Sequence, residues 1–257
     1  IRVPEMSRGL GDVYKRQMQD GAVSAVFSPN EFLSISEEQR NSMGLRALDL
    51  SKIKPCVVAG SSRKTILEVR NLALFYKKKL ILDNLNLSAA PGEIIGIIGH
   101  NGAGKSTFSR TLCGLHTNCT GQILWNGKEL NAKSRLKRSY MVMQDVSYQL
   151  FADTLEKECV FGIRHPDLDA AKQAMERLGI YDYRTHHPNT LSGGQKQRAA
   201  VAVSMVCRKD ILIFDEPTSG LDYDSMTQVV GLFQTLSQMG KVIFVVTHDY
   251  ESVSYTH

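Results

Sequence analysis

The stretch Gly99-His100-Asn101-Gly102-Ala103-Gly104-Lys105-Ser106-Thr107 decides the fold, because its glycines, lysine and serine have the spacing G-x-x-x-x-G-K-S. A short apolar run, residues 94–98, precedes it, and a segment with a helical pattern follows it through Phe108 and Leu112. A buried strand, a glycine-rich turn and the start of a helix are the context in which this spacing forms a phosphate-binding loop. The stretch therefore predicts a strand–loop–helix unit that binds an anion.

Each residue type in this loop suits a triphosphate. Glycines adopt positive φ and carry no side chain, so backbone N–H groups and the positive end of the helix can face phosphate oxygens. Lys105 has the reach for the β- and γ-phosphates, and the Ser106 hydroxyl is a ligand for Mg²⁺. An ordinary glycine-rich turn with a surface lysine would lack the flanking patterns. The nucleotide-binding residues expected here are Gly99, Asn101, Gly102, Ala103, Gly104, Lys105, Ser106 and Thr107.

Composition limits the class of protein. The chain has 257 residues, of which 42% are hydrophobic and 22% charged, as in an ordinary globular protein. Its net charge of +5 suits an anion-binding protein and does not indicate a nucleic-acid partner. No apolar run approaches the ~20 residues that span a bilayer, so a role at a membrane would need a separate membrane partner.

A second motif, Ile211-Leu212-Ile213-Phe214-Asp215-Glu216, is an apolar strand that ends in two carboxylates. Ligands of a parallel sheet bind at the carboxyl ends of its strands. Asp215 is therefore expected to hold Mg²⁺, and Glu216 to polarise a water that attacks the γ-phosphate. Two solvated acids at a strand end are common, but together with the phosphate loop the pair predicts nucleotide hydrolysis.

A third motif, Leu191-Ser192-Gly193-Gly194-Gln195, opens a predicted helix. A hydroxyl and two glycines at a helix N-terminus form a second anion site. The alternative is an ordinary serine cap on a flexible turn. One chain thus carries two devices for binding phosphate.

The remaining pattern predicts a mixed α/β fold. Alternating apolar residues indicate strands over residues 66–69, 72–76 and 81–87, and Asn126-Gly127 indicates a hairpin turn. Further strands are expected within residues 138–144 and over 211–214 and 242–246, and helices over 154–180 (capped by Asp167 or Asp169), 193–207 and 225–238. Strands that alternate with helices predict a mainly parallel sheet covered by helices, and the earlier strands predict a smaller antiparallel layer.

The two ends of the chain differ from the rest. Asp12-Val13-Tyr14-Lys15-Arg16-Gln17 resembles the translation of the transposase end sequence used in sequencing libraries, and residues 253–257 resemble its opposite strand. We therefore expect residues 1–17 and 253–257 to be sequencing artefacts of a truncated frame, a disordered natural tail being the alternative. Residues 18–50 hold a strand–turn–strand pattern at 18–23 and a helix opened by Ser34-Ile35-Ser36-Glu37, and residues 51–64 have the composition of a linker.

Residues 65–252 resemble the ATP-binding-cassette (ABC) ATPases. The phosphate loop matches the Walker A motif of that family, residues 211–216 match Walker B, and Leu191–Gln195 match the family signature. The other matching positions are the Q-loop glutamine Gln144, the D-loop Ser219-Gly220-Leu221-Asp222, the switch histidine His248 and the adenine-stacking aromatic Tyr76. An isolated glutamine or histidine is usually a surface residue, and it is the order of these motifs that favours the family.

The resemblance implies a fold and a mechanism. It implies a P-loop NTPase core of the RecA type, an antiparallel β layer and a helical subdomain over about residues 150–207. Two cassettes would pack head to tail, so that Ser192 and Gly194 serve the ATP of the partner. Gln144 would contact Mg²⁺, the attacking water and a membrane subunit, and His248 would contact the γ-phosphate. The implied cofactors are ATP and Mg²⁺.

The subfamily rests on weaker patterns. Met143-Gln144-Asp145-Val146-Ser147-Tyr148-Gln149-Leu150-Phe151 resembles the Q-loop region of energy-coupling-factor (ECF) and cobalt-type importers, and residues 43–48 resemble the linker of fused two-cassette ECF ATPases. Residues 18–50 would then be the remnant of a preceding cassette fused upstream, a linker-like extension of a single cassette being the alternative.

This resemblance implies an ATPase subunit at the cytoplasmic face of the membrane, peripheral to a transmembrane coupling subunit that takes up a vitamin or metal ion. Two other classes remain: a soluble tandem ABC protein that acts on ribosomes or nucleic acid, and a degenerate cassette that only binds nucleotide. The first usually has a long charged helical insertion, which residues 52–64 are too short to form, and intact Glu216 and His248 argue against the second.

Overall fold

The computed structural model describes residues 15–19, 22–43, 45, 64–219 and 223–247. It divides into two compact units, one built mainly from residues 1–52 and the other from most of the remaining chain, and each unit is described by itself.

The N-terminal unit holds a hairpin and two short helices. Strands β1 (Lys15–Gln19) and β2 (Ala22–Phe27) pair antiparallel, so the two strands expected within residues 18–23 are present, while the expected turn at residues 20–21 lies outside the described residues. The first strand begins at Lys15, within residues 1–17, for which the sequence predicts a sequencing artefact. Helix α1 (Pro29–Ser34) was not expected; its N-cap Ser28 forms a capping box with Glu31.

The second helix of this unit, α2 (Glu37–Ser42), begins near the expected place but with a different cap. The capping-box pattern had placed Ser34 at the N-cap. In the structure the Gln39 N–H donates instead to the Ser36 hydroxyl (3.2 Å). The Ser34 hydroxyl donates to the Glu31 carbonyl (2.8 Å), because Ser34 is the last residue of α1. The expectation for Ser34 was therefore wrong.

The larger unit contains an antiparallel sheet with the strand order β4-β3-β6-β7. Its strands are β4 (Lys79–Ala89), β3 (Leu67–Tyr76), β6 (Cys119–Trp125) and β7 (Lys128–Glu129). The two strands expected at residues 66–69 and 72–76 are the single strand β3. Asn71 has φ +47° within it, and the strand continues because the Asn71 N–H donates to the Asn86 side chain (2.8 Å).

A second sheet is parallel throughout, with the order β5-β10-β9-β8. Its strands are β5 (Ile94–Ile97), β10 (Val242–Val246), β9 (Ile211–Asp215) and β8 (Ser139–Val142). Val246 lies opposite both Ile97 and Asp215, so three strands end at one edge of the sheet. Strand β5 is half-buried rather than buried as expected, because it is an end strand of the sheet over the residues described.

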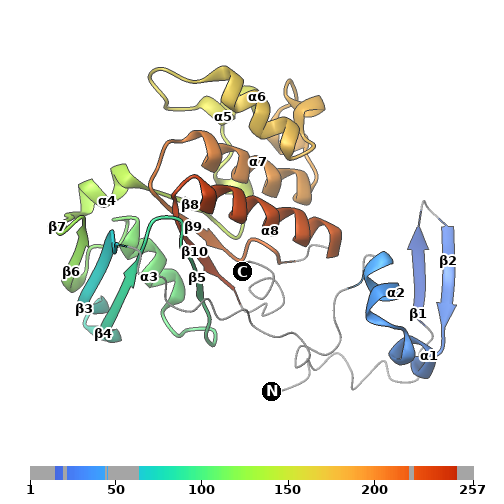
Figure 1. The fold of residues 1–257 in the computed structure, drawn as a ribbon, viewed down its shortest axis with the longest axis horizontal. Helices are drawn as coiled ribbons and strands as arrows, with labels where there is room; N and C mark the ends of the chain where they lie inside the picture. The colour runs from blue at the N-terminus through green and yellow to red at the C-terminus, as the bar shows by residue number, and fades with distance from the viewer. Residues whose placement is uncertain (1–14, 20–21, 44, 46–63, 220–222, 248–257) are drawn as a thin grey trace. The chain divides into compact units, whose positions relative to one another are not determined.

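Helices follow most of the predicted segments (Figure 1). They are α3 (Lys105–Leu112), α4 (Ala132–Arg138), α5 (Leu155–Val160), α6 (Leu168–Arg177), α7 (Gly193–Val206) and α8 (Tyr223–Gln238). The helical stretch expected over residues 154–180 is two helices, because Gly162 has φ +74° and Asp167 caps α6 by accepting from the Ala170 N–H (2.9 Å). Of the two proposed caps, Asp167 is confirmed. Helix α4 was not expected.

The parallel sheet has a hydrophobic core on each face. Leu212 and Phe214 of β9 belong to a buried cluster shared with helices α5 to α8, while Ile211 and Ile213 belong to a second cluster shared with α3 and the antiparallel sheet. Strands β9 and β10 are continuously apolar because both of their faces are buried. Figure 1 shows α7 and α8 lying over one side of this sheet, with α5 and α6 beyond α7.

Gly121, within β6, and Gly127, in the turn between β6 and β7, test how closely the strands of the antiparallel sheet pack. Gly121 and Gly127 both have positive φ (+91° and +74°), but a Cβ at Gly121 would lie 2.4 Å from the Asn71 carbonyl oxygen, whereas a Cβ at Gly127 would meet nothing within 4 Å. Gly127→Ala should cost about 1 kcal/mol for its backbone conformation, and Gly121→Ala about 1 to 3 kcal/mol more for the overlap. Urea unfolding of both variants measures the difference, and equal costs would contradict the geometry.

Candidate nucleotide-binding site

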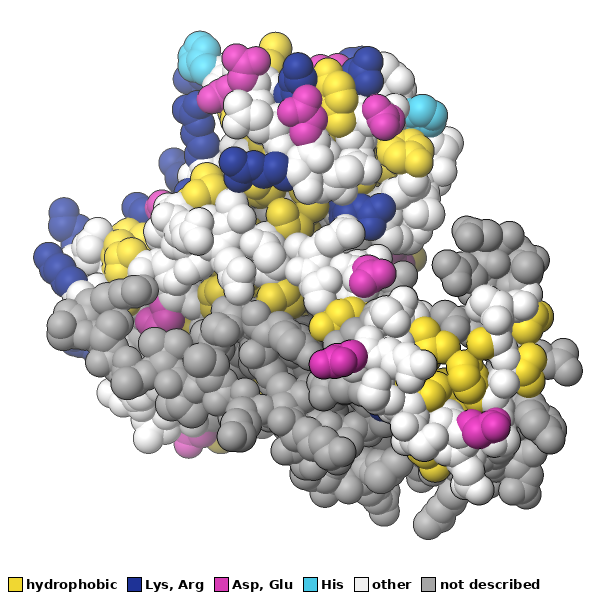
Figure 2. Space-filling view, turned by 45° about the vertical axis from the view of Figure 1, so that its right-hand side comes forward, with side chains coloured by type: hydrophobic (Ala, Val, Ile, Leu, Met, Phe, Trp, Pro, Cys, Tyr) yellow, Lys and Arg dark blue, Asp and Glu magenta, His cyan; other side chains and the backbone are white. Residues whose placement is uncertain are grey.

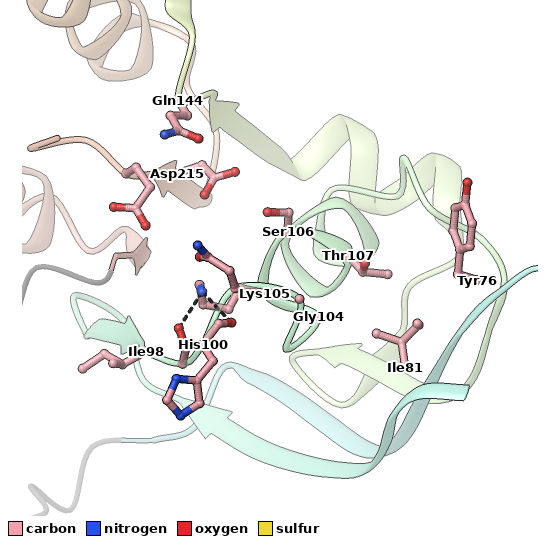
Figure 3. A pocket seen from close by; sticks show the side chains of 14 residues that line it. Tyr76, Ile81, Ile98, His100, Gly104, Lys105, Ser106, Thr107, Gln144 and Asp215 are labelled. Carbon is pink, nitrogen blue, oxygen red and sulfur yellow. Dashed lines mark hydrogen bonds between the residues drawn. The ribbon is translucent and has the colours of Figure 1, made fainter. Parts of the chain in front are cut away.

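A cavity of about 780 Å³ opens at the edge where the parallel strands end (Figure 3). Most of the residues expected to bind nucleotide or metal line it: Tyr76, Gly99, Asn101, Gly102, Gly104, Lys105, Ser106, Thr107, Gln144, Asp215 and Glu216. Ala103, which was expected among them, is not part of the lining. Ile81, Ile98 and His100 line it as well and were not expected.

The phosphate loop wraps around the ammonium group of its own lysine. Lys105 Nζ donates to the carbonyl oxygens of Gly99 (2.7 Å) and His100 (3.1 Å), so the side chain lies back across the loop (Figure 3). Gly102 and Gly104 have φ of +83° and +94°. A Cβ at Gly104 would lie 2.8 Å from Ile81 Cγ2, so this position needs glycine both for its backbone and for its closeness to Ile81.

Helix α3 begins at the loop with unsatisfied donors. Its N-cap is Gly104, which makes no side-chain capping bond, and the first backbone bond of the helix runs from the Phe108 N–H to the Gly104 carbonyl (2.8 Å). The N–H groups of the first turn therefore need acceptors from outside the helix. Together with the Lys105 ammonium, they make this end of the cavity suited to an anion such as a phosphate.

Two carboxylates close the opposite side of the cavity. Burial raises the pKa of Asp215 above its ordinary value, and the neighbouring Glu216 raises it further, whereas Arg110, Lys105 and a hydrogen bond from Ser106 lower it. Because a half-buried carboxylate beside a second one is unfavourable, a divalent cation here would relieve the repulsion. Carboxylate, hydroxyl and amide oxygens from Asp215, Ser106 and Gln144 are ligands that suit Mg²⁺.

Glu216 is held in an unusual conformation at the end of β9. Its φ is +52°, which is costly for a residue with a Cβ. The Glu216 N–H donates to the Val246 carbonyl (2.8 Å), and the Thr247 hydroxyl donates to Glu216 Oε2 (3.2 Å). Thr247 is fully buried, and its N–H donates to the Ile97 carbonyl (3.2 Å). The carboxylate is therefore fixed relative to the strand that leads into the phosphate loop.

Gln144 is an exposed residue of an anchored loop. Gln149 fixes this loop to β8 by donating to the Met141 carbonyl (2.5 Å) and accepting from the Met143 N–H (2.6 Å). Val146, within the loop, is buried in the core. The loop thus presents Gln144 to the cavity beside Asp215 (Figure 3).

Tyr76 lies at the far side of the cavity from Asp215, at the end of β3 (Figure 3). Its side chain is 63% exposed, which leaves a ring face accessible to a planar ligand. The cavity therefore has an aromatic end at Tyr76, a cationic middle at Lys105 and an acidic end at Asp215 and Glu216. The base, the phosphates and the bound metal of a nucleoside triphosphate follow one another in the same order.

The Leu191–Gln195 motif does not line this cavity. It forms the start of α7, where Ser192 and Gln195 make a capping box: the Gln195 N–H donates to the Ser192 hydroxyl (3.4 Å), and the Ser192 N–H donates to Gln195 Oε1 (2.8 Å). Leu191 is buried in the core, whereas Gly193 is exposed with open space where a Cβ would lie. The glycine face of this helix start is therefore open to a ligand or partner.

Some expected site residues lie outside the described part of the chain. These are His248 and the D-loop residues Gly220, Leu221 and Asp222. Ser219 is described; it is exposed, and its N–H donates to the Glu216 carbonyl (3.2 Å). Among the described residues, no group of three His, Cys, Asp or Glu side chains is arranged to hold a metal ion.

A glycine-rich loop at a helix start, facing a strand that ends in carboxylates, defines the P-loop class of nucleotide-binding proteins. The family model named "ABC transporter" matches residues 82–219, and the chain belongs to this family. The family resemblance, the ATP-binding domain and the ABC-type α/β fold expected from the sequence are thereby confirmed.

The chain is similar to proteins provisionally named as ABC transporter ATP-binding proteins. One from Treponema denticola is 40% identical over 242 residues, covering 92% of this chain and 50% of the relative, and one from Methanosarcina acetivorans is 31% identical over 245 residues, covering 92% and 46%. The chain thus spans about half the length of these curated relatives.

Solved structures that resemble this one include the following two. CbiO1 of Clostridium perfringens, described as part of the ABC transporter complex CbiONQ, has a TM-score of 0.65 and 30% identity, covering 72% of this chain and 79% of that one. A bacterial Atm1-family ABC exporter with ATP bound has a TM-score of 0.64 and 26% identity, covering 84% and 40%.

The raised pKa of Asp215 makes a prediction about stability. A carboxyl whose pKa is higher in the folded state than in the unfolded chain destabilises the fold when it is ionised, so Asp215→Asn should stabilise the ligand-free chain at pH 7. We expect the unfolding midpoint to rise by about 2 °C. The gain should shrink as the pH is lowered through the raised pKa of the native carboxyl, which takes up its proton there, and should be lost below the ordinary aspartate pKa of 3.8.

Asp153→Asn is the matched control, because Asp153 is an exposed residue that pairs with Lys157 in solvent (3.2 Å). It should change the midpoint by less than about 1 °C. Calorimetry without nucleotide or metal compares the two variants, and a lower midpoint for Asp215→Asn at pH 7 would contradict the assignment of burial as the cause.

Proposed function

We propose that the chain binds MgATP and hydrolyses it as the ATP-binding subunit of an ABC importer of the ECF type. The observation that carries the proposal is the single cavity that holds the phosphate loop on one side and the paired Asp215 and Glu216 on the other. ATP hydrolysis needs a phosphate cradle, a metal site and a base for water in one place, and these residue types supply all three.

Each residue has a role in this proposal. The loop amides and Lys105 bind the β- and γ-phosphates, and Tyr76 stacks on adenine. Ser106, Asp215 and Gln144 would hold Mg²⁺, which would neutralise charge on the phosphates. Glu216, oriented by the Thr247 hydroxyl (3.2 Å), accepts a hydrogen bond from the attacking water and polarises it. His248 contacts the γ-phosphate.

Glu216→Gln tests the base. The amide keeps the size of the side chain but cannot take up a proton, so turnover should fall by about 10²- to 10⁴-fold while ATP affinity stays within about threefold. Equilibrium binding and steady-state hydrolysis measure the two effects. Glu176→Gln, in an exposed i,i+4 pair with Lys172 on α6, is the control and should leave both unchanged. Near-normal turnover of Glu216→Gln would remove Glu216 as the base.

We further propose that the complete site needs a second cassette packed head to tail. The open helix start at Ser192, Gly193 and Gly194 lies outside the chain's own cavity, which leaves it accessible to the ATP of a partner. The D-loop, Ser219 to Asp222, would lie at the same interface. The relatives are about twice as long as this chain, which is compatible with a second cassette fused upstream in the full protein.

If each site needs a second cassette, the rate of ATP hydrolysis by the isolated chain should depend on the protein concentration. Hydrolysis per chain should be slow at low concentration and rise with concentration, because each productive site needs two chains. Steady-state assays together with light scattering measure this. Efficient hydrolysis by a chain shown to be monomeric would contradict the head-to-tail site.

Mixing two inactive variants is the control for this prediction. Lys105→Ala disables the phosphate loop and Ser192→Arg blocks the open helix start, so a mixed dimer has one doubly defective site and one intact site. An equal mixture should recover about a quarter of the native activity, because half of the dimers are mixed and each has one working site. No recovery in a mixture that forms dimers would mean that the two motifs do not meet across the interface.

The transport role is supported by a neighbour and by an exposed surface. CbiO1 is part of an ABC transporter complex. Tyr148 and Phe151, which follow Gln144 in the same segment, are 72% and 70% exposed, and large exposed apolar side chains of this kind suit a transmembrane coupling subunit. In the described part of the chain no helix has the length and apolar character to cross a bilayer. We therefore propose a peripheral position at the cytoplasmic membrane face and uptake of a vitamin or metal ion.

The rival proposal, a soluble ABC protein that acts on ribosomes or nucleic acid, lacks support from surface charge. In Figure 2, acidic side chains lie among the basic ones over the upper part of the molecule, where α5 and α6 lie. On α6, Lys172 pairs with Glu176 (3.8 Å). A nucleic-acid surface would instead gather lysine and arginine in one patch.

A further inference from the structure

We propose that His116 is a positioning residue for adenine: it fixes the turn that carries Tyr76 at a set distance from the phosphate loop. The inference rests on the proposed stacking of Tyr76 on adenine and adds the group that holds Tyr76 in place. It starts from a hydrogen-bond cluster between residues 75–77 and residues 116–118, which are 41 residues apart in the sequence.

His116 is the centre of this cluster. Its ring nitrogen Nε2 lies 3.0 Å from the Phe75 carbonyl oxygen and 3.2 Å from the Asn118 carbonyl oxygen. Both neighbours are acceptors only, so Nε2 carries the proton and donates to both. The ring thereby links the last residue before Tyr76 to the segment that enters β6.

Asn118 completes the link on the other side of Tyr76. Its side-chain Nδ2 donates to the Lys77 carbonyl (2.8 Å), and its backbone carbonyl accepts from the Phe75 N–H (3.0 Å). Lys77 has φ +54°, a conformation that a lysine rarely adopts without support. Phe75 and Lys77, on either side of Tyr76, therefore both form hydrogen bonds with residues 116–118. The Tyr76 side chain itself is exposed.

The segment that holds the turn is itself attached to α3. The N–H groups of Leu115 and His116 both donate to the Arg110 carbonyl (2.8 and 3.1 Å), in the last turn of that helix. The other end of α3 begins at Lys105 of the phosphate loop. One rigid helix of about 12 Å therefore separates the phosphate loop from the anchor of Tyr76. We infer that His116 sets the spacing between the adenine and the phosphate subsites.

The test compares ATP with inorganic triphosphate, which shares the phosphates but has no base to stack. His116→Ala should weaken ATP binding about 3- to 10-fold, the range expected for one lost hydrogen-bonding group, and leave triphosphate binding unchanged. His116→Gln keeps a nitrogen donor on a side chain of similar reach and should restore most of the ATP affinity. Thr117→Ala, an exposed position of the same segment, is the matched control and should behave as native. Calorimetric titration of the full chain measures both ligands.

Two results would overturn the proposal: unchanged ATP affinity in His116→Ala, or an equal loss for ATP and triphosphate, which would indicate a general structural effect.

Tyr76→Ala separates this proposal from the stacking on which it rests. If Tyr76→Ala leaves ATP affinity unchanged, stacking is wrong, and hydrogen exchange of the Phe75 amide decides the role of His116. Faster exchange in His116→Ala than in the native chain then supports the positioning of the turn, and unchanged exchange overturns it.

Discussion

The parallel register of β5, β10 and β9 is the constraint on which the site depends. Val246 lies opposite Ile97 on one side and Asp215 on the other, so the phosphate loop and the carboxylates leave the sheet at the same level. Thr247 then bonds to both neighbours, through its N–H to Ile97 and through its hydroxyl to Glu216. A shift of one residue in β10 would break both contacts and exchange the side chains that the strand places in the two cores.

Two unfavourable features lie at the same edge of the sheet: repulsion between neighbouring carboxylates and a strained backbone. Asp215 is half-buried beside Glu216, and Glu216 itself has a left-handed backbone. The continuous apolar core on both faces of β9 stabilises the strand enough to tolerate them. Lys105 and Arg110 offset part of the repulsion and lower the pKa of Asp215. Strain of this kind at a strand end is typical of sites that bind a cation, where the ligand removes the repulsion.

The features that the sequence predicts correctly are those set by interactions between residues that are close together in the chain. The strand, loop and helix start around residues 99–107, the Asp167 cap and the bounds of β10 at Val242–Val246 are encoded by neighbouring residues and are confirmed. The continuity of β3 through Asn71 depends on Asn86, 15 residues away, and no local pattern indicates it. Ile81 was missed for the same reason, because its role is to pack against Gly104 across a loop. His248 and the D-loop stay predictions.

The two ends of the cavity come from different sheets, and one core joins them. Tyr76 extends from the antiparallel sheet, and Asp215 from the parallel sheet. Helix α3 buries Phe108 and Leu112 in the cluster that both sheets share, and Phe108 packs edge-on against Phe244 of β10 (6.2 Å between ring centroids). The loop at residues 99–107 lies at the start of α3, and the segment that bonds to the Tyr76 turn is attached to its end. If Tyr76 stacks on adenine as proposed, the packing of α3 between the two sheets would set the distance between the adenine and the phosphate subsites.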